Sequence, residues 1–322
     1  MSHSWLGSLP DLESLTAHLR AALPAGAGSE VPLSVLERRP MPFASSSPSE
    51  IVTCRVDDGP VLQLYCKYGA RHGREDHRHR GDRRYEAAVY REVLQPLGLS
   101  TPLFYGSSTS SETGETLLVL EYLGPCPRVN EAADCDALLR AARWIGRFHS
   151  LNEAHPSAAA LFCYRAEYYL GWARRTAEFA APLQRRFPWL GELCDGFEQV
   201  AACLLAPPRD LIHGEYYPHN ILFRDGVVHP IDWESAALAP GEIDLASLTD
   251  RWPAAIAADC TREYVCARWA EGAPPAFARR LDAARMYLQL RWLGDRPEWT
   301  LHERLRWRFR ELRRLGKRWG LV

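Results

Sequence analysis

One stretch in the second half of this 322-residue chain does most to limit what the chain can fold into. Two apolar runs, Asp210–Ile212 and Val227–Ile231, flank a segment that reads His-Gly-Glu-Tyr-Tyr-Pro-His-Asn-Ile-Leu. Arg224-Asp225-Gly226, just before the second run, is a turn signal. This order predicts a polar loop and then a β-hairpin, with the carboxylate of Asp232 directly after the hairpin.

Three polar residues of this stretch occur in the order that phosphoryl transfer requires. Such a site needs a carboxylate beside the acceptor hydroxyl, an amide oxygen a few residues later that holds magnesium, and a second carboxylate on the metal. Glu215, Asn220 and Asp232 fill these roles in turn. Oxygen atoms are the ligands that magnesium prefers. We therefore predict that Glu215, Asn220 and Asp232 are catalytic residues, with Asn220 and Asp232 as the metal ligands.

The neighbours of these residues have supporting roles. We expect His213 to brace the loop through hydrogen bonds, Gly214 to serve the backbone geometry, and Pro218 to fix the backbone just before the metal ligand. The alternative is a buried hairpin with incidental polar residues. Glu234 has three interpretations: a ligand of a second metal ion, an ion pair with an arginine, or a solvent-facing side chain.

This block resembles the aminoglycoside phosphotransferase and choline kinase family of small-molecule kinases. The family signature is His-Gly-Asp, four residues, Asn, and an apolar hairpin that ends in Ile-Asp-Trp or Ile-Asp-Phe. The chain departs from it at Glu215, where the family usually has Asp. The extra methylene moves the carboxylate by a little over ~1 Å, and such a shift can cost on the order of a hundredfold in rate. Asp244 matches a downstream Asp of the family and is expected to brace the loop.

The resemblance implies an α+β, two-lobed protein-kinase-like fold. Residues 1–123 would form a small β-rich N-terminal lobe that binds nucleotide. Residues 124–322 would form a mainly helical C-terminal lobe with the catalytic and acceptor sites. Helical periodicity over 136–149 and 166–179 agrees with this division. We expect the catalytic hairpin to be the only β-structure of the second lobe.

Such a kinase needs a strand lysine that binds phosphates and a helix glutamate that positions it. Lys67 lies near the end of the second of two β-rich runs, 51–56 and 61–68, which Asp57-Asp58-Gly59-Pro60 joins as a hairpin. Glu86 lies in the first turn of a helical pattern over 83–97. The alternatives are a solvated strand end for Lys67 and an exposed helix acid for Glu86.

The resemblance also indicates where the nucleotide would bind. Pro42–Glu50 falls where a phosphate-covering loop belongs, and the hydroxyls of Ser45, Ser46 and Ser47 could donate to phosphate oxygens. A linker is the alternative. The apolar run 117–123 ends at Gly124-Pro125, which suits the hinge between lobes. Glu121 and Leu123 are therefore the expected positions for main-chain contacts to the base.

Composition excludes several classes of protein. The chain is 47% hydrophobic and 25% charged, as in ordinary globular proteins, and its net charge of −1 favours neither nucleic acid nor membrane as a partner. The N-terminus lacks the features of a signal peptide, so we expect a cytoplasmic location. Nine cysteines without paired spacing predict reduced thiols.

Two segments of the chain are rich in basic residues. The segment 71–84, rich in His and Arg, is predicted to be a solvated loop, although metal binding and contact with phosphate are the alternatives. The segment 305–319 is predicted to be a basic amphipathic helix packed on the larger lobe, and binding of a membrane surface or anionic partner is the alternative.

The predicted reaction is transfer of the γ-phosphoryl group of ATP, or GTP, to a hydroxyl of a small molecule with Mg²⁺, and an antibiotic or other natural product would be such an acceptor. The Arg-rich C-terminus favours a neutral or anionic acceptor. Two alternatives stay open. One is a Ser/Thr kinase of a precursor peptide in natural-product biosynthesis. The other is a pseudokinase that binds nucleotide or a partner, which the departure at Glu215 permits.

Overall fold

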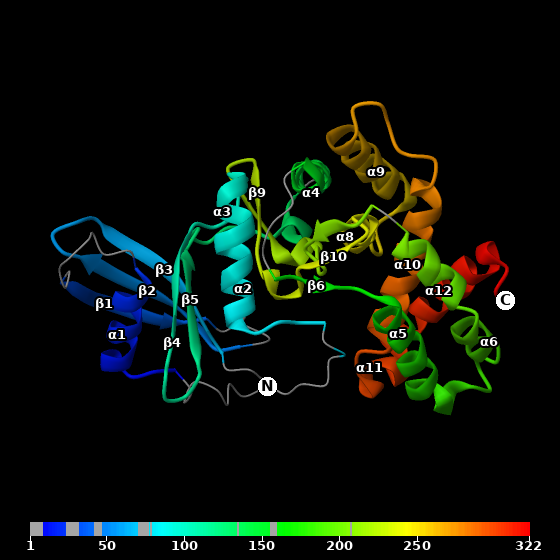
Figure 1. The fold of residues 1–322 in the computed structure, drawn as a ribbon, viewed down its shortest axis with the longest axis horizontal. Coiled ribbons are helices and arrows are strands. Elements are labelled where there is room, and N and C mark those ends of the chain that lie inside the picture. The colour runs from blue at the N-terminus through cyan, green and yellow to red at the C-terminus, as the bar shows by residue number, and fades with distance from the viewer. Residues whose placement is uncertain are drawn as a thin grey trace.

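A computed structural model describes residues 9–23, 32–41, 47–69, 77, 79–133, 135–154, 160–206 and 208–322. Figure 1 shows two parts. A β-sheet with helix α1 (Leu12–Ala22) against it forms the N-terminal part, and helices dominate the C-terminal part. The helices α2 and α3 stand between them (Figure 1). The predicted α+β arrangement, with a β-rich N-terminal part and a mainly helical C-terminal part, is confirmed.

The N-terminal sheet is antiparallel and has the order β1-β2-β3-β5-β4. Its strands are β1 (Leu33–Pro40), β2 (Ser49–Val56), β3 (Val61–Gly69), β4 (Phe104–Thr109) and β5 (Thr116–Glu121). The predicted hairpin is the β2–β3 pair, whose turn holds Asp57 at φ 52°. Leu15 and Leu19 of α1 pack in one core with Val52, Leu64 and Val119, and this apolar burial holds α1 on the sheet.

The helix predicted over 83–97 is present and begins and ends as expected. It runs as α2 (Arg83–Val89), a π-helical segment (Tyr90–Leu94) and α3 (Gln95–Leu97). The Asp82 side chain accepts from the Tyr85 N–H at its start, and Gly98 adopts φ 60° at its end. Val89, Tyr90 and Val93 are buried in the main core, so the helix packs against the C-terminal part.

Helices make up most of the C-terminal part. They are α4 (Asp136–Ala154), α5 (Ala166–Phe179), α6 (Leu190–Asp195), α7 (Glu198–Leu205), α8 (Glu242–Leu248), α9 (Ala254–Arg268), α10 (Phe277–Leu293), α11 (Pro297–Leu301) and α12 (Arg306–Trp319). No helix in the described ranges is long and apolar enough to cross a membrane. The prediction for 305–319 is confirmed as far as packing goes, because Phe309 of α12 is buried and stacks on Phe187.

The expectation of a single hairpin in this part was wrong. Besides β8 (Ile221–Arg224) and β9 (Val227–Pro230), a three-stranded sheet joins β6 (Phe162–Cys163), β10 (Ala237–Ala239) and β7 (Asp210–Ile212). The strands β6 and β10 have only two or three residues, so no periodicity announces them in the sequence. This sheet carries β7, which leads directly into the polar loop.

Candidate active site

The polar loop after β7 is held by one buried carboxylate. Asp244 Oδ2 accepts from the His213 N–H at 2.7 Å, and its Oδ1 accepts from the Gly214 N–H at 2.9 Å. Gly214 adopts φ 81°, and a Cβ there would lie 2.2 Å from the Ser235 carbonyl oxygen. Only glycine fits this position. Asp244 therefore braces the loop, as the sequence predicts.

His213 links the loop to the hairpin. Its Nε2 lies 2.9 Å from the Ile231 carbonyl oxygen, and its Nδ1 accepts from the Glu215 N–H at 3.3 Å. Pro218 begins the 3-10 turn Pro218–Asn220. Asn220 Nδ2 donates to the Glu215 carbonyl oxygen at 3.0 Å, a bond that does not use the amide oxygen. The loop thus holds Glu215 and Asn220 by hydrogen bonds within a few residues.

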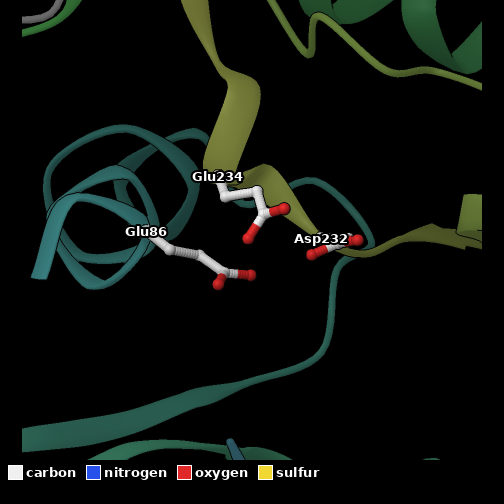
Figure 2. Close-up of side chains that lie close together, drawn as sticks. All are labelled: Glu86, Asp232 and Glu234. Carbon is white, nitrogen blue, oxygen red and sulfur yellow. The ribbon is translucent and has the colours of Figure 1, made fainter. Parts of the chain in front are cut away.

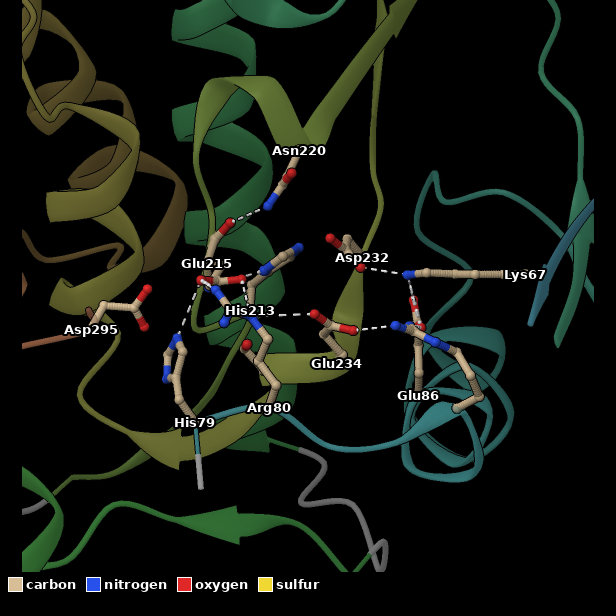
Figure 3. Close-up of polar contacts among 12 residues, drawn as sticks. Lys67, His79, Arg80, Glu86, His213, Glu215, Asn220, Asp232, Glu234 and Asp295 are labelled. Carbon is tan, nitrogen blue, oxygen red and sulfur yellow. Dashed lines mark hydrogen bonds and ion pairs between the residues drawn. The ribbon is translucent and has the colours of Figure 1, made fainter. Parts of the chain in front are cut away.

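Asp232 lies directly after β9 with a left-handed backbone, φ 69° and ψ 59°. Its Oδ1 accepts from Lys67 Nζ at 2.5 Å, and the same ammonium donates to both oxygens of Glu86 at 3.0 Å (Figure 3). Burial and the charge of Arg83 act to lower the pKa of Lys67, but Asp232 and Glu86 outweigh them and raise it. The contact between Lys67 and Glu86 is the one that the resemblance to kinases led us to expect, and neither side chain is solvated.

Glu234 is buried and forms ion pairs. This excludes a solvent-facing side chain and agrees with an ion pair to an arginine, while a role as a metal ligand stays a prediction. Arg83 Nη2 donates to it at 2.6 Å, and Arg80 Nε lies 3.3 Å away. Its carboxylate also points toward Glu86 and Asp232 (Figure 2), and ligand atoms of these three residues lie within 4.8 Å of one another. Burial, followed by the charge of Asp232, raises the pKa of Glu234 to about 7.

Glu215 is enclosed by cations. Its Oε1 accepts from Arg80 Nη2 at 2.7 Å and from Arg291, and its Oε2 lies 3.3 Å from Arg80 Nε (Figure 3). His79 Nε2 lies 3.4 Å from Oε1. Burial acts to raise the pKa of Glu215, but the charges of Arg291 and Arg80 outweigh it and hold the pKa well below its usual range. The side chain is therefore an ionised carboxylate at neutral pH.

The described ion pairs form one continuous chain of alternating charge. Its order is Lys67, Glu86, Arg83, Glu234, Arg80, Glu215 and Arg291. Each carboxylate in this chain contacts two cationic side chains, and burial leaves these ion pairs little screened by salt. The arrangement holds α2 to the catalytic loop through charge rather than through apolar packing alone.

His79 completes the surroundings of Glu215. It is fully buried, and Arg291 Nε donates to its Nε2 at 3.1 Å. Its Nδ1 lies 2.7 Å from the Tyr168 hydroxyl, which lies 2.8 Å from that of Tyr287. Burial, followed by the charge of Arg291, lowers the pKa of His79 to about 3, so the ring is neutral. Because Nε2 accepts, Nδ1 carries the proton.

The prediction of a solvated loop over 71–84 was wrong for the part of it that the structure describes. His79 and Arg83 are buried, and Arg80 reaches Glu215 and Glu234. Arg80, His79 and Arg291 were not predicted as site residues. The position of His79 and Arg80 just before the helix cap Asp82 was an available signal, since it ties them to the helix that carries Glu86. Residues 71–76 and 78 lie outside the described residues.

The remaining candidates concern nucleotide binding. Ser45 and Ser46 lie outside the described residues, and the Ser47 hydroxyl is buried without a hydrogen-bond partner among those described. The Glu121 N–H donates to the Leu103 carbonyl oxygen at 2.8 Å, so this donor is already used. Leu123 lines a pocket together with Gly124, Pro125 and Phe223. The roles of Ser47, Glu121 and Leu123 stay predictions.

Comparison with known proteins gives the same architecture. Choline kinase from Cryptosporidium parvum Iowa II is 12% identical, with a TM-score of 0.63 over 97% of this chain and 98% of that chain. Choline kinase LicA from Streptococcus pneumoniae is 14% identical, with a TM-score of 0.60 over 89% and 94%. Amicoumacin kinase hAmiN, in complex with AMP-PNP, Ca²⁺ and Ami, is 11% identical, with a TM-score of 0.60 over 98% and 95%. No curated protein sequence matches the chain.

The site brings a lysine, a helix glutamate and two loop carboxylates into one cluster. Together with the fold, this cluster defines the class of kinase-like phosphotransferases. A family model described as "Phosphotransferase enzyme family" matches residues 67–279, which is more than half of the chain. The chain belongs to this family.

Proposed function

We propose that the protein transfers the γ-phosphoryl group of ATP, or GTP, to a hydroxyl of a small molecule. One observation carries the proposal: Lys67 contacts both Glu86 and Asp232, at 3.0 and 2.5 Å. These residues come from a strand, a helix and the end of a hairpin, and the pattern is the one that phosphoryl transfer uses to hold phosphates. Family membership and the kinase-like neighbours support a small-molecule phosphotransferase.

The donor set fits Mg²⁺. Asp232 offers a carboxylate with a 27% exposed side chain, and the Asn220 amide oxygen is not used by that side chain's bond to Glu215. Carboxylate and amide oxygens are hard ligands, as this ion requires. Asp232 and Asn220 would hold it, with Glu234 close enough to Asp232 to assist. The ion, when bound, would neutralise charge on the transferring phosphoryl group.

The protein's own residues would do the rest. Lys67, held by Glu86, would bind phosphate oxygens. Glu215 would orient the acceptor hydroxyl as an ionised carboxylate, because its low pKa makes it a weak base. A weak base suffices here, since the transition state of phosphoryl transfer is loose and requires little proton removal in advance.

A nucleotide-binding protein without transferase activity is the second candidate. The observation that favours it is the pairing of both Glu215 oxygens with arginines, with two donors on Oε1 and one on Oε2. In this case the Lys67 end of the site would bind nucleotide and Glu215 would serve structure alone.

The test is magnesium-dependent ATP turnover by the purified chain beside Asp232→Asn. The matched control is Asp225→Asn, which changes an exposed aspartate at the turn of the same hairpin. Transferase activity predicts turnover that falls on the order of a hundredfold or more in Asp232→Asn and is unchanged in Asp225→Asn. Nucleotide binding with no turnover, with and without a broad set of hydroxyl compounds, would favour the second candidate.

A further inference from the structure

The acceptor hydroxyl and Arg80 compete for the same atoms. A hydroxyl oriented by Glu215 must come within about 2.6–3.2 Å of a carboxylate oxygen. Oε1 already accepts from Arg80 at 2.7 Å and from Arg291, and Oε2 lies 3.3 Å from Arg80 Nε (Figure 3). A hydroxyl that binds Oε1 must therefore displace one of these guanidinium groups.

Arg80 is the group that can leave. The Arg291 side chain is 2% exposed and donates to the buried ring of His79, which fixes it in place. The Arg80 side chain is 25% exposed. Its departure would uncover the oxygen that it shares with Arg291 and would leave Glu215 ionised, because Arg291 remains paired with it.

A displaced Arg80 would need a new anion. Within the described residues its other carboxylate contact is Glu234 at 3.3 Å, and Glu234 already pairs with Arg83 at 2.6 Å. A guanidinium that loses a partner in a partly buried site loses stabilisation, unless an incoming group replaces the lost charge. An acceptor with a negative group beside its hydroxyl supplies that charge, whereas a cationic acceptor would meet Arg80 and Arg291 unfavourably.

A second observation concerns donors next to Arg291. Among the described residues, Tyr217 Oη, Trp292 Nε1 and Arg308 Nε are buried without a hydrogen-bond partner. The three side chains lie close together, because the Trp292 ring is 5.6 Å from the Tyr217 ring and 4.6 Å from the Arg308 guanidinium. Buried donors without partners favour a ligand that is rich in acceptor atoms.

Two carboxylates also lie in this region. Asp250 accepts from Arg308 Nη2 at 2.9 Å. Asp295 lies 3.7 Å from Arg296 Nε, and its charge acts on Arg291. Its Oδ2 is buried without a hydrogen-bond partner among the described residues, so it offers an acceptor to a donor group of the ligand.

We propose that Arg80 determines acceptor specificity by exchanging Glu215 for an anionic group of the acceptor, a carboxylate or a phosphate close to the reacting hydroxyl. The inference rests on the proposed function and narrows its substrate class. Arg80 binds and selects the acceptor, and it takes no part in moving the phosphoryl group.

The experiment uses the full chain and a water-soluble metabolite extract, separated by ion exchange into anionic, neutral and cationic pools. Nucleotide binding is measured first by calorimetry, and ADP formation is then followed with each pool. We expect the anionic pool to raise ADP formation several-fold above the acceptor-free rate. Arg80→Gln should raise the half-saturating amount of that pool about tenfold to a hundredfold, with the KM for ATP within about twofold.

Two further variants separate specificity from folding. Arg80→Lys keeps the positive charge, so it should retain the preference for the anionic pool with weaker binding. Arg91→Gln is the matched control, because Arg91 is exposed and pairs with its neighbour Glu92, and it should behave as the unchanged protein. Melting temperatures of all variants report on folding.

Two results would overturn the inference. They are turnover driven by the neutral or cationic pool, and an Arg80→Gln protein that loses ATP affinity but not acceptor affinity. Failure to bind nucleotide, or nucleotide binding without turnover in any pool, would instead overturn the proposed function itself, so the two failures are distinguishable.

Discussion

The Lys67 ammonium lies 2.5 Å from the Asp232 carboxylate, although 165 positions separate the two residues in the chain. The contact brings the end of strand β3 to the end of strand β9. Burial and Arg83 oppose the charge on Lys67, so this ammonium depends on Asp232 and Glu86 for its stability. A phosphate group that entered here would meet a cation already held in place.

The length of Glu215 can be tested with Glu215→Asp. Removing one methylene withdraws the carboxylate by a little over ~1 Å, away from Arg80, Arg291 and His79. We expect ATP turnover to fall on the order of a hundredfold and the free energy of unfolding to fall by about 1–3 kcal/mol, because a buried guanidinium loses its partner. Glu198→Asp, at an exposed position of α7, is the control. A gain in turnover would show that the longer side chain is a defect.

Glu234 should make stability depend on pH. Its pKa is raised from 4.5 to about 7 in the folded chain. Between these values the folded state holds a proton that the unfolded state has lost, so this group's contribution to stability is full below 4.5 and is lost as pH rises through about 7. Glu234→Gln removes that dependence.

Urea denaturation of both proteins at about pH 5 and about pH 8 measures the effect of Glu234. We expect the stability of Glu234→Gln relative to the unchanged chain to rise with pH. A difference that is the same at both pH values would contradict the assigned pKa.

His79 should make stability depend on pH in the opposite direction. Its pKa is lowered from 6.5 to about 3, so below 6.5 the unfolded state takes up a proton that the folded state does not bind. The contribution of the neutral ring is therefore full above 6.5 and is lost as pH falls toward 3. His79→Leu should destabilise the chain by about 1–3 kcal/mol at neutral pH, because Arg291 loses its acceptor, and by less near pH 5.

Two glycines with the same backbone conformation give a matched pair. Gly214 and Gly124 adopt φ 81° and 82°, but a Cβ would lie 2.2 Å from the Ser235 carbonyl oxygen at Gly214 and would contact nothing within 4 Å at Gly124. Gly124→Ala should cost about 1 kcal/mol of unfolding free energy, from the backbone alone. Gly214→Ala should cost more than about 3 kcal/mol and abolish turnover, because the catalytic loop must move. Equal losses in thermal denaturation would contradict the steric argument.

Several features could be predicted because their signals are local. Asp57-Asp58-Gly59-Pro60 and Arg224-Asp225-Gly226 carry their own turn chemistry, and both hairpins formed where they indicated. The apolar period of 83–97 predicted the helix that carries Glu86. The contact of Lys67 with Glu86 was expected from the lysine–glutamate pair that a kinase-like site needs.

Other features had no local signal. Arg80, Glu215 and Arg291 meet although they are far apart in the chain, and the sequence suggested solvent around the first of them. The π-helical segment Tyr90–Leu94 and the strands β6 and β10 are likewise set by packing against distant neighbours.

The sequence by itself determined which chemical groups are available and which of them lie on one stretch of the chain: Glu215, Asn220 and Asp232 at the spacing of a phosphotransferase. Tertiary structure alone decided the state of those groups. Burial and the approach of Arg80 and Arg291 hold Glu215 ionised, and burial beside Asp232 raises the pKa of Glu234 to about 7. The physical reason is that the pKa and the accessibility of a side chain depend on what surrounds it in space, and its chain neighbours supply only a small part of those surroundings.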